Sequence, residues 1–458
     1  MRPVKKDVFR AYDIRGKVGQ DFDPEWVERF GQACGTSFLH KGHDHAVVGR
    51  DCRHSSPEFQ ARLVEGLVST GINVTYLPMV PTPLFYFAVR TLKHQAGVMI
   101  TASHNPPEYN GFKVWAGQNT IHTAEIQNLY SVMQKGHFEH GSGIAGEFNV
   151  IPHYLEEVAG HIKLSTPLRI VVDGGNGSAG LVCAELLKRQ GAEVIPLYCD
   201  PDPDFPNHHP DPTVLENITD LQAEVRRQQA HFGVGLDGDG DRIGVVDDQG
   251  RIMYGDQLLA VFARDLLAEH PGSIILGEVK CSHLLFKDIQ DHGGQPVMYK
   301  TGHSLIKARM KETGAQLAGE MSGHMFFADR YYGFDDALYA AARLAEIVSK
   351  NPAKPLGSYL DDWPKTFNTP EIRMDCPDEI KFRVVDLARE YFQNSIDSFE
   401  LNDVDGVRIN FADGWGLLRA SNTQPVLVLR FEAESQARLD EIRAFFEQPL
   451  QTWIAELT

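Results

Sequence analysis

Short apolar runs alternate with longer amphipathic segments through most of the chain, and this alternation predicts the fold class. The runs have the length and composition of buried strands, while the segments between them have helical spacing. Strands are predicted at residues 45–51, 72–78, 96–103, 168–175, 192–198, 232–238, 272–279 and 296–300. Helices are predicted at residues 57–71, 83–92, 179–191, 216–230, 256–270, 284–294 and 303–314. This order indicates βαβ units, so we expect an α/β fold with largely parallel sheets.

The segment after residue 366 has a different order. A strand-like stretch precedes a helix, and three strand-like stretches then follow one another before a last helix that starts near Gln436. This is an α+β pattern, which indicates a separate domain. The three earlier stretches resemble one another in layout and suggest a triplicated domain. We therefore predict four domains, at residues 1–150, 151–253, 254–366 and 367–458.

Composition narrows the classes of function. The 458 residues are 42% hydrophobic and 23% charged, which excludes a disordered or fibrous chain. The 44 basic and 62 acidic side chains leave a net charge of −18, which disfavours nucleic acid and anionic membranes as partners. Six widely spaced cysteines and no long apolar run favour a cytoplasmic protein without a membrane span. We expect a monomer, and a dimer stays open.

The segment Thr101-Ala-Ser-His-Asn-Pro-Pro follows an apolar run and is the first candidate for chemistry. The prolines restrict the backbone, so the hydroxyl of Ser103 would be held at the carboxyl edge of a sheet, where α/β proteins place their chemistry. An ordinary serine turn is the alternative. The G-x-S-x-G sequence of hydrolases is absent around Ser103, which disfavours a lipase-type triad.

The second candidate is the glycine-rich segment that contains Asp237, Asp239 and Asp241. Carboxylates at alternate positions of a tight loop can converge on one hard cation, most plausibly Mg²⁺. An EF-hand would need glycine and glutamate where Arg242 and Asp248 stand, so that interpretation fails. An exposed acidic turn remains the alternative.

Two further segments have the composition of recognition loops. Glu320, Ser322 and His324 place a carboxylate, a hydroxyl and an imidazole within five residues, which suits hydrogen bonding to sugar hydroxyls. The stretch 419–425 contains Arg419, Ser421, Asn422 and Thr423, which could form a phosphate cradle between two strands. A capped turn and a hairpin turn are the respective alternatives.

A third glycine-rich segment favours a different class of function. Gly175, Gly177 and Gly180 match G-x-G-x-x-G between a predicted strand and helix, and Asp200 ends the next strand. That layout is typical of a nicotinamide-dependent oxidoreductase. Asp173 speaks against it, because a negative charge beside the turn would oppose a pyrophosphate. A nonenzymatic cation-binding scaffold is a third hypothesis.

Seven motifs in order make the chain resemble the α-D-phosphohexomutase superfamily over essentially its whole length: YDIRG, TASHNP, NGFK, DGDGDR, TGHS, GEMSGH and RASNTQP. GEMSGH with SNTQP is similar to the bacterial phosphomannomutase/phosphoglucomutase branch. Phosphoglucosamine mutases usually carry GEQSGH and an SGTEP-type loop, so the chain departs from them at both places, and that activity is kept as the alternative.

The resemblance implies a heart-shaped protein of three related α/β domains with mixed sheets and a fourth α+β domain, each with a loop in one cleft. The implied reaction moves phosphate reversibly between O6 and O1 of mannose or glucose phosphates. Ser103 would carry the phosphate, and a 1,6-bisphosphorylated sugar would be the intermediate and, when added, the activator. Mg²⁺ would be held by Ser103 and the three aspartates.

The resemblance also implies roles for individual residues. The catalytic residues would be Arg15, Ser103, His104, Lys113, Arg242 and His324. The substrate-binding residues would be Tyr12, Lys280, His303, Glu320, Ser322, Arg419, Ser421, Asn422 and Thr423. As general acid–base we favour Lys113, whose pKa Arg15 and desolvation should lower, with His324 as an auxiliary donor. His303 and His104 are the other candidates, and we expect His104 to point away from the sugar.

Overall fold

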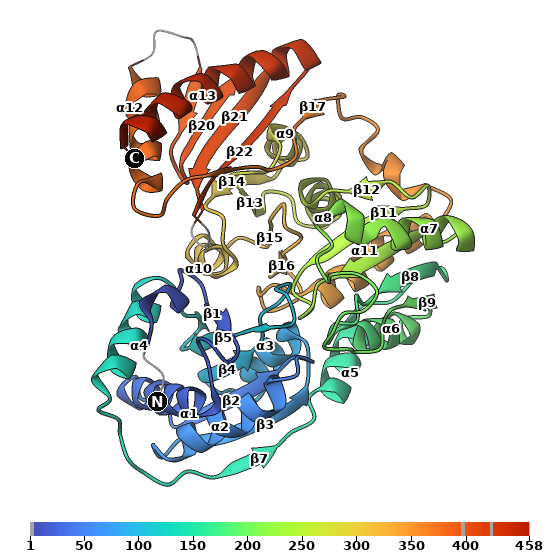
Figure 1. Ribbon diagram of the computed structural model, residues 1–458. Helices are drawn as coiled ribbons and strands as arrows, with labels where there is room; N and C mark the ends of the chain where they lie inside the picture. Colours follow the sequence, from blue (N-terminus) through green and yellow to red (C-terminus); the bar gives the residue numbers. More distant parts are fainter. Residues whose placement is uncertain (1–3, 395–398, 422–424, 458) are drawn as a thin grey trace.

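The computed structural model describes residues 4–394, 399–421 and 425–457. Four parts follow one another along the chain and form an open crescent (Figure 1). The N-terminal part lies at one end, the C-terminal part at the other, and the two middle parts join them along one side.

The first part contains a mixed sheet in the order β1-β5-β4-β2-β3-β7, with β6 paired to β5. Its strands are β1 Ile14–Lys17, β2 His45–Arg50, β3 Asn73–Met79, β4 Ala96–Ile100, β5 Tyr109–Ala116, β6 Asn119–Thr120 and β7 Ala145–Glu147. Its helices are η1 Lys6–Val8, α1 Pro24–His40, α2 Ser56–Val68, α3 Thr82–Thr91 and α4 Ala124–Lys135.

The second and third parts contain smaller mixed sheets, in the orders β12-β11-β10-β8-β9 and β14-β13-β15-β16. The second is built from α5 Ile151–His161, β8 Arg169–Asp173, α6 Gly180–Arg189, β9 Glu193–Leu197, η2 Leu215–Ile218, α7 Thr219–Gln228, β10 Phe232–Leu236, β11 Ile243–Asp247 and β12 Ile252–Met253. The third is built from α8 Gly255–Glu269, β13 Ile274–Glu278, α9 His283–Asp291, β14 Gln295–Tyr299, α10 His303–Thr313, β15 Leu317–Gly319, β16 Met325–Phe327, α11 Ala337–Lys350 and η3 Leu356–Leu360.

The three sheets share one topology. Each has three parallel strands and a fourth antiparallel strand, in the orders β3-β2-β4-β5, β9-β8-β10-β11 and β14-β13-β15-β16. This arrangement confirms the predicted α/β class and is the one expected of a triplicated domain. The connection from the third parallel strand to the antiparallel strand is residues 101–108, 237–242 and 320–324, respectively. Three of the loops selected from the sequence therefore occupy equivalent positions.

The fourth part is an antiparallel sheet in the order β17-β22-β21-β20-β19, with β18 on β22. Its elements are β17 Phe367–Asn368, β18 Ile372–Asp375, α12 Lys381–Gln393, β19 Glu400–Asn402, β20 Val407–Phe411, β21 Gly414–Ala420, β22 Val426–Ala433 and α13 Gln436–Leu457. Helices α12 and α13 cover one face of this sheet (Figure 1). The predicted α+β domain is confirmed.

The hydrophobic cores show which parts are joined most firmly. One continuous buried cluster includes Phe85 of the first part, Leu186 of the second and Leu259 of the third. The fourth part has its own core. It contacts the third part through a small cluster that contains Trp415, and Arg408 stacks on that ring at 3.8 Å while donating to the Val279 carbonyl. The first three parts therefore share apolar burial, whereas the fourth is attached through the face of its sheet that carries Trp415 and Arg408.

Some expectations need correction or completion. The helix predicted from residue 216 begins at Thr219, because residues 215–218 form a 3₁₀ turn. Helices α1, α4, α5 and α11 are additions to the prediction. All six cysteines are free, as expected. Within the described residues, no helix combines the length and apolar character needed to span a membrane.

A pH test follows from the buried start of α11. Asp336 caps this helix by accepting from the Tyr339 amide at 2.8 Å and from the Tyr331 hydroxyl at 2.9 Å. Burial raises the pKa of Asp336 to about 6. The folded protein thus binds the carboxyl proton of Asp336 more tightly than the unfolded chain does. The stabilisation that this proton gives is nearly complete below about pH 4 and is lost as the pH rises through 6.

Urea unfolding at several pH values measures this effect. Relative to Asp336→Asn, the wild type should lose about 2 kcal/mol of unfolding free energy between pH 4 and 7. Asp361→Asn, which changes an exposed carboxyl, should show no pH-dependent difference. A constant difference between wild type and Asp336→Asn would contradict the assignment.

Candidate active site

Ser103 lies in the connection between β4 and β5, and its surroundings hold the hydroxyl in one direction. The residue is 2% exposed and adopts the left-handed conformation, with φ of 51°. Its hydroxyl donates to Asp237 Oδ2 at 2.6 Å, and His104 Nδ1 lies 3.0 Å from the same oxygen. The His104 ring therefore lies against the serine of its own loop, and the expectation that it points away from the sugar stays a prediction.

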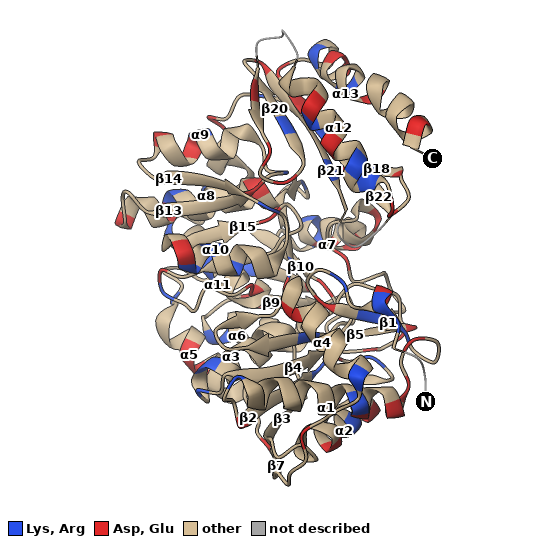
Figure 2. Ribbon diagram, turned by 90° about the vertical axis from the view of Figure 1, so that its left-hand side faces the viewer, with Lys and Arg blue, Asp and Glu red and all other residues tan. Residues whose placement is uncertain are grey.

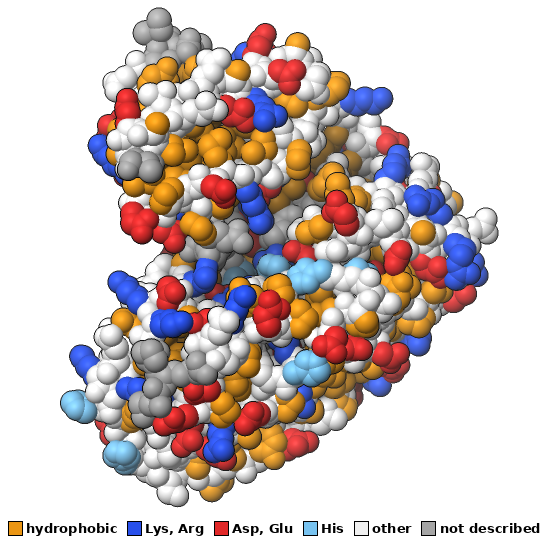
Figure 3. All heavy atoms as spheres, viewed as in Figure 1, with side chains coloured by type: hydrophobic (Ala, Val, Ile, Leu, Met, Phe, Trp, Pro, Cys, Tyr) orange, Lys and Arg blue, Asp and Glu red, His pale blue; other side chains and the backbone are white. Residues whose placement is uncertain are grey.

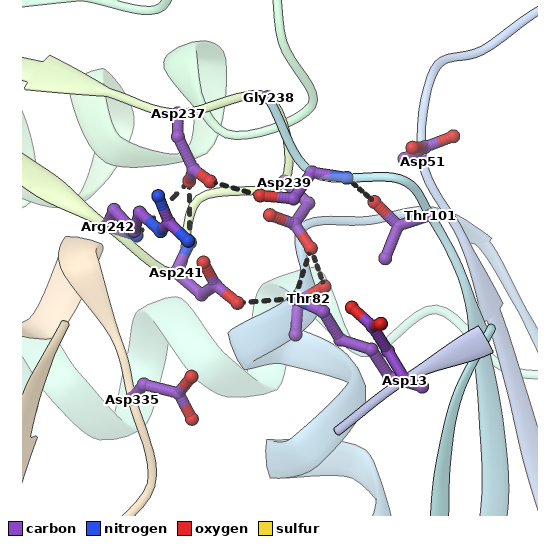
Figure 4. Close-up of polar contacts among 12 residues, drawn as sticks. Asp13, Asp51, Thr82, Thr101, Asp237, Gly238, Asp239, Asp241, Arg242 and Asp335 are labelled. Carbon is purple, nitrogen blue, oxygen red and sulfur yellow. Dashed lines mark hydrogen bonds and ion pairs between the residues drawn. The ribbon is translucent and has the colours of Figure 1, made fainter. Parts of the chain in front are cut away.

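The three aspartates of the β10–β11 connection converge beside this serine (Figure 4). Asp237, Asp239 and Asp241 are fully buried, and one oxygen of each lies within 4.8 Å of the others. Asp239 Oδ2 accepts from Thr82 Oγ1 at 2.6 Å. Asp237 Oδ1 accepts the backbone amides of Asp241 and Arg242, both at 3.1 Å.

The cluster has the properties of a cation site. Among the described residues, no hydrogen-bond donor reaches Asp239 Oδ1 or Asp241 Oδ1, although both atoms are buried. Burial and the two neighbouring carboxylates raise the pKa of Asp237 well above its ordinary value. A divalent cation would satisfy the open oxygens and offset the repulsion. The residues present therefore fit a hard metal ion.

Lys113 of β5 contacts the same cluster, and its charge differs from the expectation. Its ammonium donates to Asp239 at 2.7 Å and also to Asp241. Burial by itself lowers the pKa of Lys113, but these carboxylates outweigh burial and raise it above the ordinary value. Our expectation that desolvation and Arg15 lower this pKa was wrong. Lys113 is a charged partner of the acidic loop.

Two arginines frame the serine and the aspartates. Arg15 of β1 donates to Asp13 at 2.6 Å and to the Asn105 side chain, in the serine loop, at 2.7 Å. Arg242 follows the acidic loop, and its Nε donates to His324 Nε2 at 3.1 Å. Arg15 therefore contacts the serine loop, and Arg242 contacts the histidine of the β15–β16 loop.

The three histidines differ in their ionisation. Burial, together with Arg242 and Arg15, lowers the pKa of His104 well below its ordinary value. Burial and Lys307 have the same effect on the pKa of His303. For His324, burial is outweighed by Asp241 and by Asp335, whose Oδ2 lies 3.2 Å from Nδ1, and its pKa is raised. His324 is therefore the one of these three whose surroundings favour a bound proton.

The β15–β16 connection contacts the loop that precedes α10, and that loop in turn contacts the first part. Glu320 is 2% exposed and accepts the Gly302 amide at 2.6 Å. Ser322 Oγ lies at 3.5 Å from the Glu320 carboxylate. Tyr12 donates to the Thr301 carbonyl at 3.0 Å, and its ring lies 6.4 Å from that of His303. These contacts bring together the predicted residues of two distant segments.

The predicted substrate-binding cations Lys280 and Arg419 lie at the boundary of the third and fourth parts. Lys280 is paired with Glu371 at 3.2 Å and with Glu278 at 3.6 Å. Arg419 Nε donates to Asp405 at 2.9 Å, so its other guanidinium nitrogens are oriented by this pair.

The remaining members of the predicted phosphate cradle follow Arg419 along the chain. Ser421 is 7% exposed, and its amide donates to the Val426 carbonyl at 3.0 Å. Asn422 and Thr423 lie outside the described residues.

One face of the molecule is hollowed. Figure 3 shows this face of the molecule deeply indented between its N-terminal and C-terminal parts, with histidine side chains at the inner end. In Figure 2, acidic and basic residues are interspersed, and no separate basic face is visible in that view. The site cations Arg15, Lys113, Arg242, Lys280 and Arg419 are accompanied by carboxylates, so the site holds charges of both signs.

Several residues of the site were missed by sequence reasoning. Thr82 binds Asp239, Lys307 donates to Asp335 at 2.8 Å, and Asp405 orients Arg419. Arg53 donates to the Ser103 carbonyl at 2.8 Å. None of these residues stands inside a selected motif, although Asp51 ends a predicted strand and Arg53 lies two residues later, which is a usual position for functional residues.

Comparison with known families agrees with this geometry. Phosphoglucomutase/phosphomannomutase α/β/α domains I, II and III match residues 6–140, 152–250 and 254–367, and the C-terminal domain of the same family matches residues 371–448. The chain belongs to the phosphoglucomutase/phosphomannomutase family. The superfamily inferred from the seven motifs is thereby confirmed.

Individual family members are similar over the whole chain. The phosphomannomutase/phosphoglucomutase of Pseudomonas aeruginosa is 45% identical, with 97% of this chain and 95% of that protein covered. The phosphoglucomutase of Neisseria gonorrhoeae is 42% identical, with 99% of this chain and 98% of that protein covered. A crystal structure of a family protein from Burkholderia thailandensis matches with a TM-score of 0.92 at 42% identity over 98% of both chains.

The competing dinucleotide interpretation fails in this family member. Asp173 accepts the Gly175 amide at 2.9 Å and pairs with His208, so a carboxylate and an imidazole occupy the turn. A Cβ on Gly177 would lie 2.7 Å from the Gly238 carbonyl. The glycines thus permit close packing of this turn against the acidic loop, and the oxidoreductase alternative has no support.

Asp241 belongs to two candidate metal-binding groups, and this overlap can be tested by mutation. Asp241 belongs both to the aspartate triad and to a group with His324 and Asp335. Because Lys307 already neutralises Asp335 at 2.8 Å, we expect the triad to bind the metal. Asp239→Asn should weaken Mg²⁺ binding at least tenfold by removing one anionic ligand, as measured by calorimetry without sugar. Asp335→Asn is the matched control, and the reverse ranking would place the metal in the other group.

Proposed function

We propose that Ser103 carries the phosphoryl group in a reversible transfer between O6 and O1 of mannose or glucose phosphates. The chain is an isomerase of the phosphomannomutase/phosphoglucomutase type and acts on hexose phosphates. One observation supports the assignment of Ser103 most strongly: its hydroxyl is held 2.6 Å from a buried aspartate of a loop that fits a divalent cation. Transfer from a phosphorylated Ser103 would give a 1,6-bisphosphorylated sugar, which reorients and returns its other phosphate.

We propose Mg²⁺ as the metal, held by Asp237, Asp239 and Asp241 together with the phosphate on Ser103. When bound, the ion would neutralise charge on the transferring group. Around it, Lys113 balances part of the aspartate charge, while Arg15 and Arg242 oppose the charge of the phosphoryl oxygens. Positioning and charge neutralisation, which these residues supply, are the main requirements of phosphoryl transfer.

We propose that the other phosphate of the substrate lies between Lys280, Arg419 and Ser421. Asp405 fixes the guanidinium of Arg419 through Nε and leaves the remaining donors for a phosphate. Tyr12, His303, Glu320 and Ser322 would line the sugar site, where Glu320 and Ser322 accept and donate to its hydroxyls. Asn422 and Thr423 remain part of this proposal by sequence alone.

A bisphosphorylated sugar would act as the activator by restoring phosphate to Ser103. For the proton of the attacking hydroxyl we propose His324 in place of Lys113, because an imidazole ordinarily titrates near neutral pH, whereas two carboxylates raise the pKa of the Lys113 ammonium above its already high ordinary value. His104 would orient the Ser103 oxygen. We also propose domain boundaries near residues 150, 253 and 366. We further propose that the protein is cytoplasmic and monomeric.

Ser103→Ala tests the phosphate carrier. Turnover should fall below a few per cent, because the nucleophile is lost, while binding of glucose 1-phosphate should remain within a few-fold. Intact mass should show one phosphate on the wild type after incubation with glucose 1,6-bisphosphate and none on the variant. Ser322→Ala is a matched serine control that should still load phosphate. An active Ser103→Ala variant would refute the proposal.

The substrate preference is tested in a coupled assay with mannose, glucose and glucosamine 1-phosphates and a trace of the corresponding bisphosphate. We expect turnover of the first two. Preferential turnover of glucosamine 1-phosphate would instead favour the phosphoglucosamine mutase alternative.

His324→Asn and Lys113→Arg together test the proton transfer. The histidine change should lower kcat by roughly 10²–10⁴ and flatten its pH dependence, since it removes the acid–base group. The arginine keeps the positive charge beside the aspartates and should retain more than a tenth of kcat. If Lys113→Arg is the more damaging change and His324→Asn keeps its pH profile, Lys113 is the base.

A further inference from the structure

The segment Asp51–His54, directly after β2, lies where the first part of the chain contacts the second. Cys52 Sγ donates to the Asn176 carbonyl at 3.8 Å, and His54 lies 2.9 Å from Asp204. Between them, the guanidinium of Arg53 faces the ring of Phe205 at 5.5 Å. Phe205 belongs to the proline-rich loop 201–212, to which the proposed reaction assigns no role.

Arg53 is 1% exposed and holds the serine loop through four backbone carbonyls. Its Nη2 donates to Ser103 at 2.8 Å and to Asn105 at 2.6 Å. Its Nη1 donates to Pro106 at 2.7 Å and to Tyr109 at 3.0 Å. A planar guanidinium can direct four N–H groups to carbonyls spread over seven residues, which the single nitrogen of lysine cannot do.

Asp51 fixes the direction of this guanidinium. Its carboxylate lies 3.2 Å from Arg53 Nε and also accepts the Arg53 amide at 3.0 Å and the Ser56 hydroxyl at 2.6 Å. Figure 4 shows Asp51 beside Thr101, on the opposite side of the serine loop from the aspartates. The charge of Arg53 is thus balanced inside the first part of the chain.

Arg53 contacts two residues, Ser103 and Phe205, whose backbone is in the left-handed region that residues with a side chain rarely adopt. Ser103 has φ of 51° and Phe205 has φ of 49°, and neither is glycine. Such backbone persists only where neighbouring contacts enforce it, and it is concentrated at functional sites. The Ser103 carbonyl is also pressed against the acidic loop, since a Cβ on Gly238 would lie 2.4 Å from it. The same carbonyl therefore contacts Arg53 on one side and the proposed metal loop on the other.

We infer that Arg53 is a positioning residue for phosphoryl transfer. It fixes the strained backbone of the serine loop so that Ser103 Oγ faces Asp237, and Phe205 holds Arg53 from the neighbouring part of the chain. The loop 201–212 thereby couples the position of the serine to the part that carries the aspartates. This inference rests on the proposed role of Ser103 as phosphate carrier.

Arg53→Lys tests the inference because it keeps the positive charge and removes the guanidinium that donates to four carbonyls. A small displacement of a reacting group can cost about 10²-fold in rate. We therefore expect kcat to fall roughly 10²-fold, with KM for glucose 1-phosphate within about threefold of the wild type. The rate at which glucose 1,6-bisphosphate loads phosphate onto Ser103, followed by intact mass, should fall by a similar factor. Arg62→Lys, at an exposed position on α2, should match the wild type.

Two further measurements distinguish a positioning role of Arg53 from a general loss of stability in the variants. Phe205→Leu keeps an apolar side chain and should lower the loading rate by a smaller factor, without a change in KM. Guanidinium ions should partly restore kcat in Arg53→Ala, which a general loss of stability would not allow. Unchanged kcat and loading in Arg53→Lys, or an increase confined to KM, would overturn the inference. Failure of the wild type to take up phosphate on Ser103 would instead refute the proposed function.

Discussion

The structure depends on the burial of three carboxylates on one short loop. Asp237, Asp239 and Asp241 are all fully buried, and burial of like charges is costly unless opposite charge lies close by. Lys113 supplies one positive charge from another sheet, and the open carboxylate oxygens leave a place for a cation. The Ser103 hydroxyl completes the set. This charge requirement brings together side chains from the first two parts of the chain, and it also makes the site suitable for transfer of an anionic group.

Repetition of one topology explains how the loops meet. In each of the first three parts, the functional loop connects the third parallel strand to the antiparallel fourth strand. A loop at this position leaves the carboxyl edge of the sheet, where polar residues can face a shared space. The continuous core of these parts then keeps the serine loop, the acidic loop and the Glu320 loop in a constant relation. The chemistry thus depends on apolar packing far from the reacting atoms.

The fourth part is attached differently, and this difference suits its proposed role. Its core is separate, and it meets the third part through buried arginines that donate to backbone carbonyls. These hydrogen bonds are joined by a small apolar cluster that contains Trp415, whereas the first three parts share one continuous core. Arg419 and Lys280 lie at this boundary, each with a carboxylate partner that a phosphate can replace or supplement. The proposed site for the distant phosphate is therefore separate from the part that holds the serine.

The sequence by itself determined the architecture and the chemical groups. Alternating runs predict βαβ units because side-chain periodicity follows from backbone geometry. Motifs such as Asp237-Gly-Asp-Gly-Asp reveal a cation site because their ligands are neighbours on one loop. Only the tertiary structure decided the charge on Lys113, the direction of His104 and the hold of Arg53 on the serine loop. These properties arise from burial and from contacts between residues far apart in the chain, and neither can be calculated from spacing along a sequence.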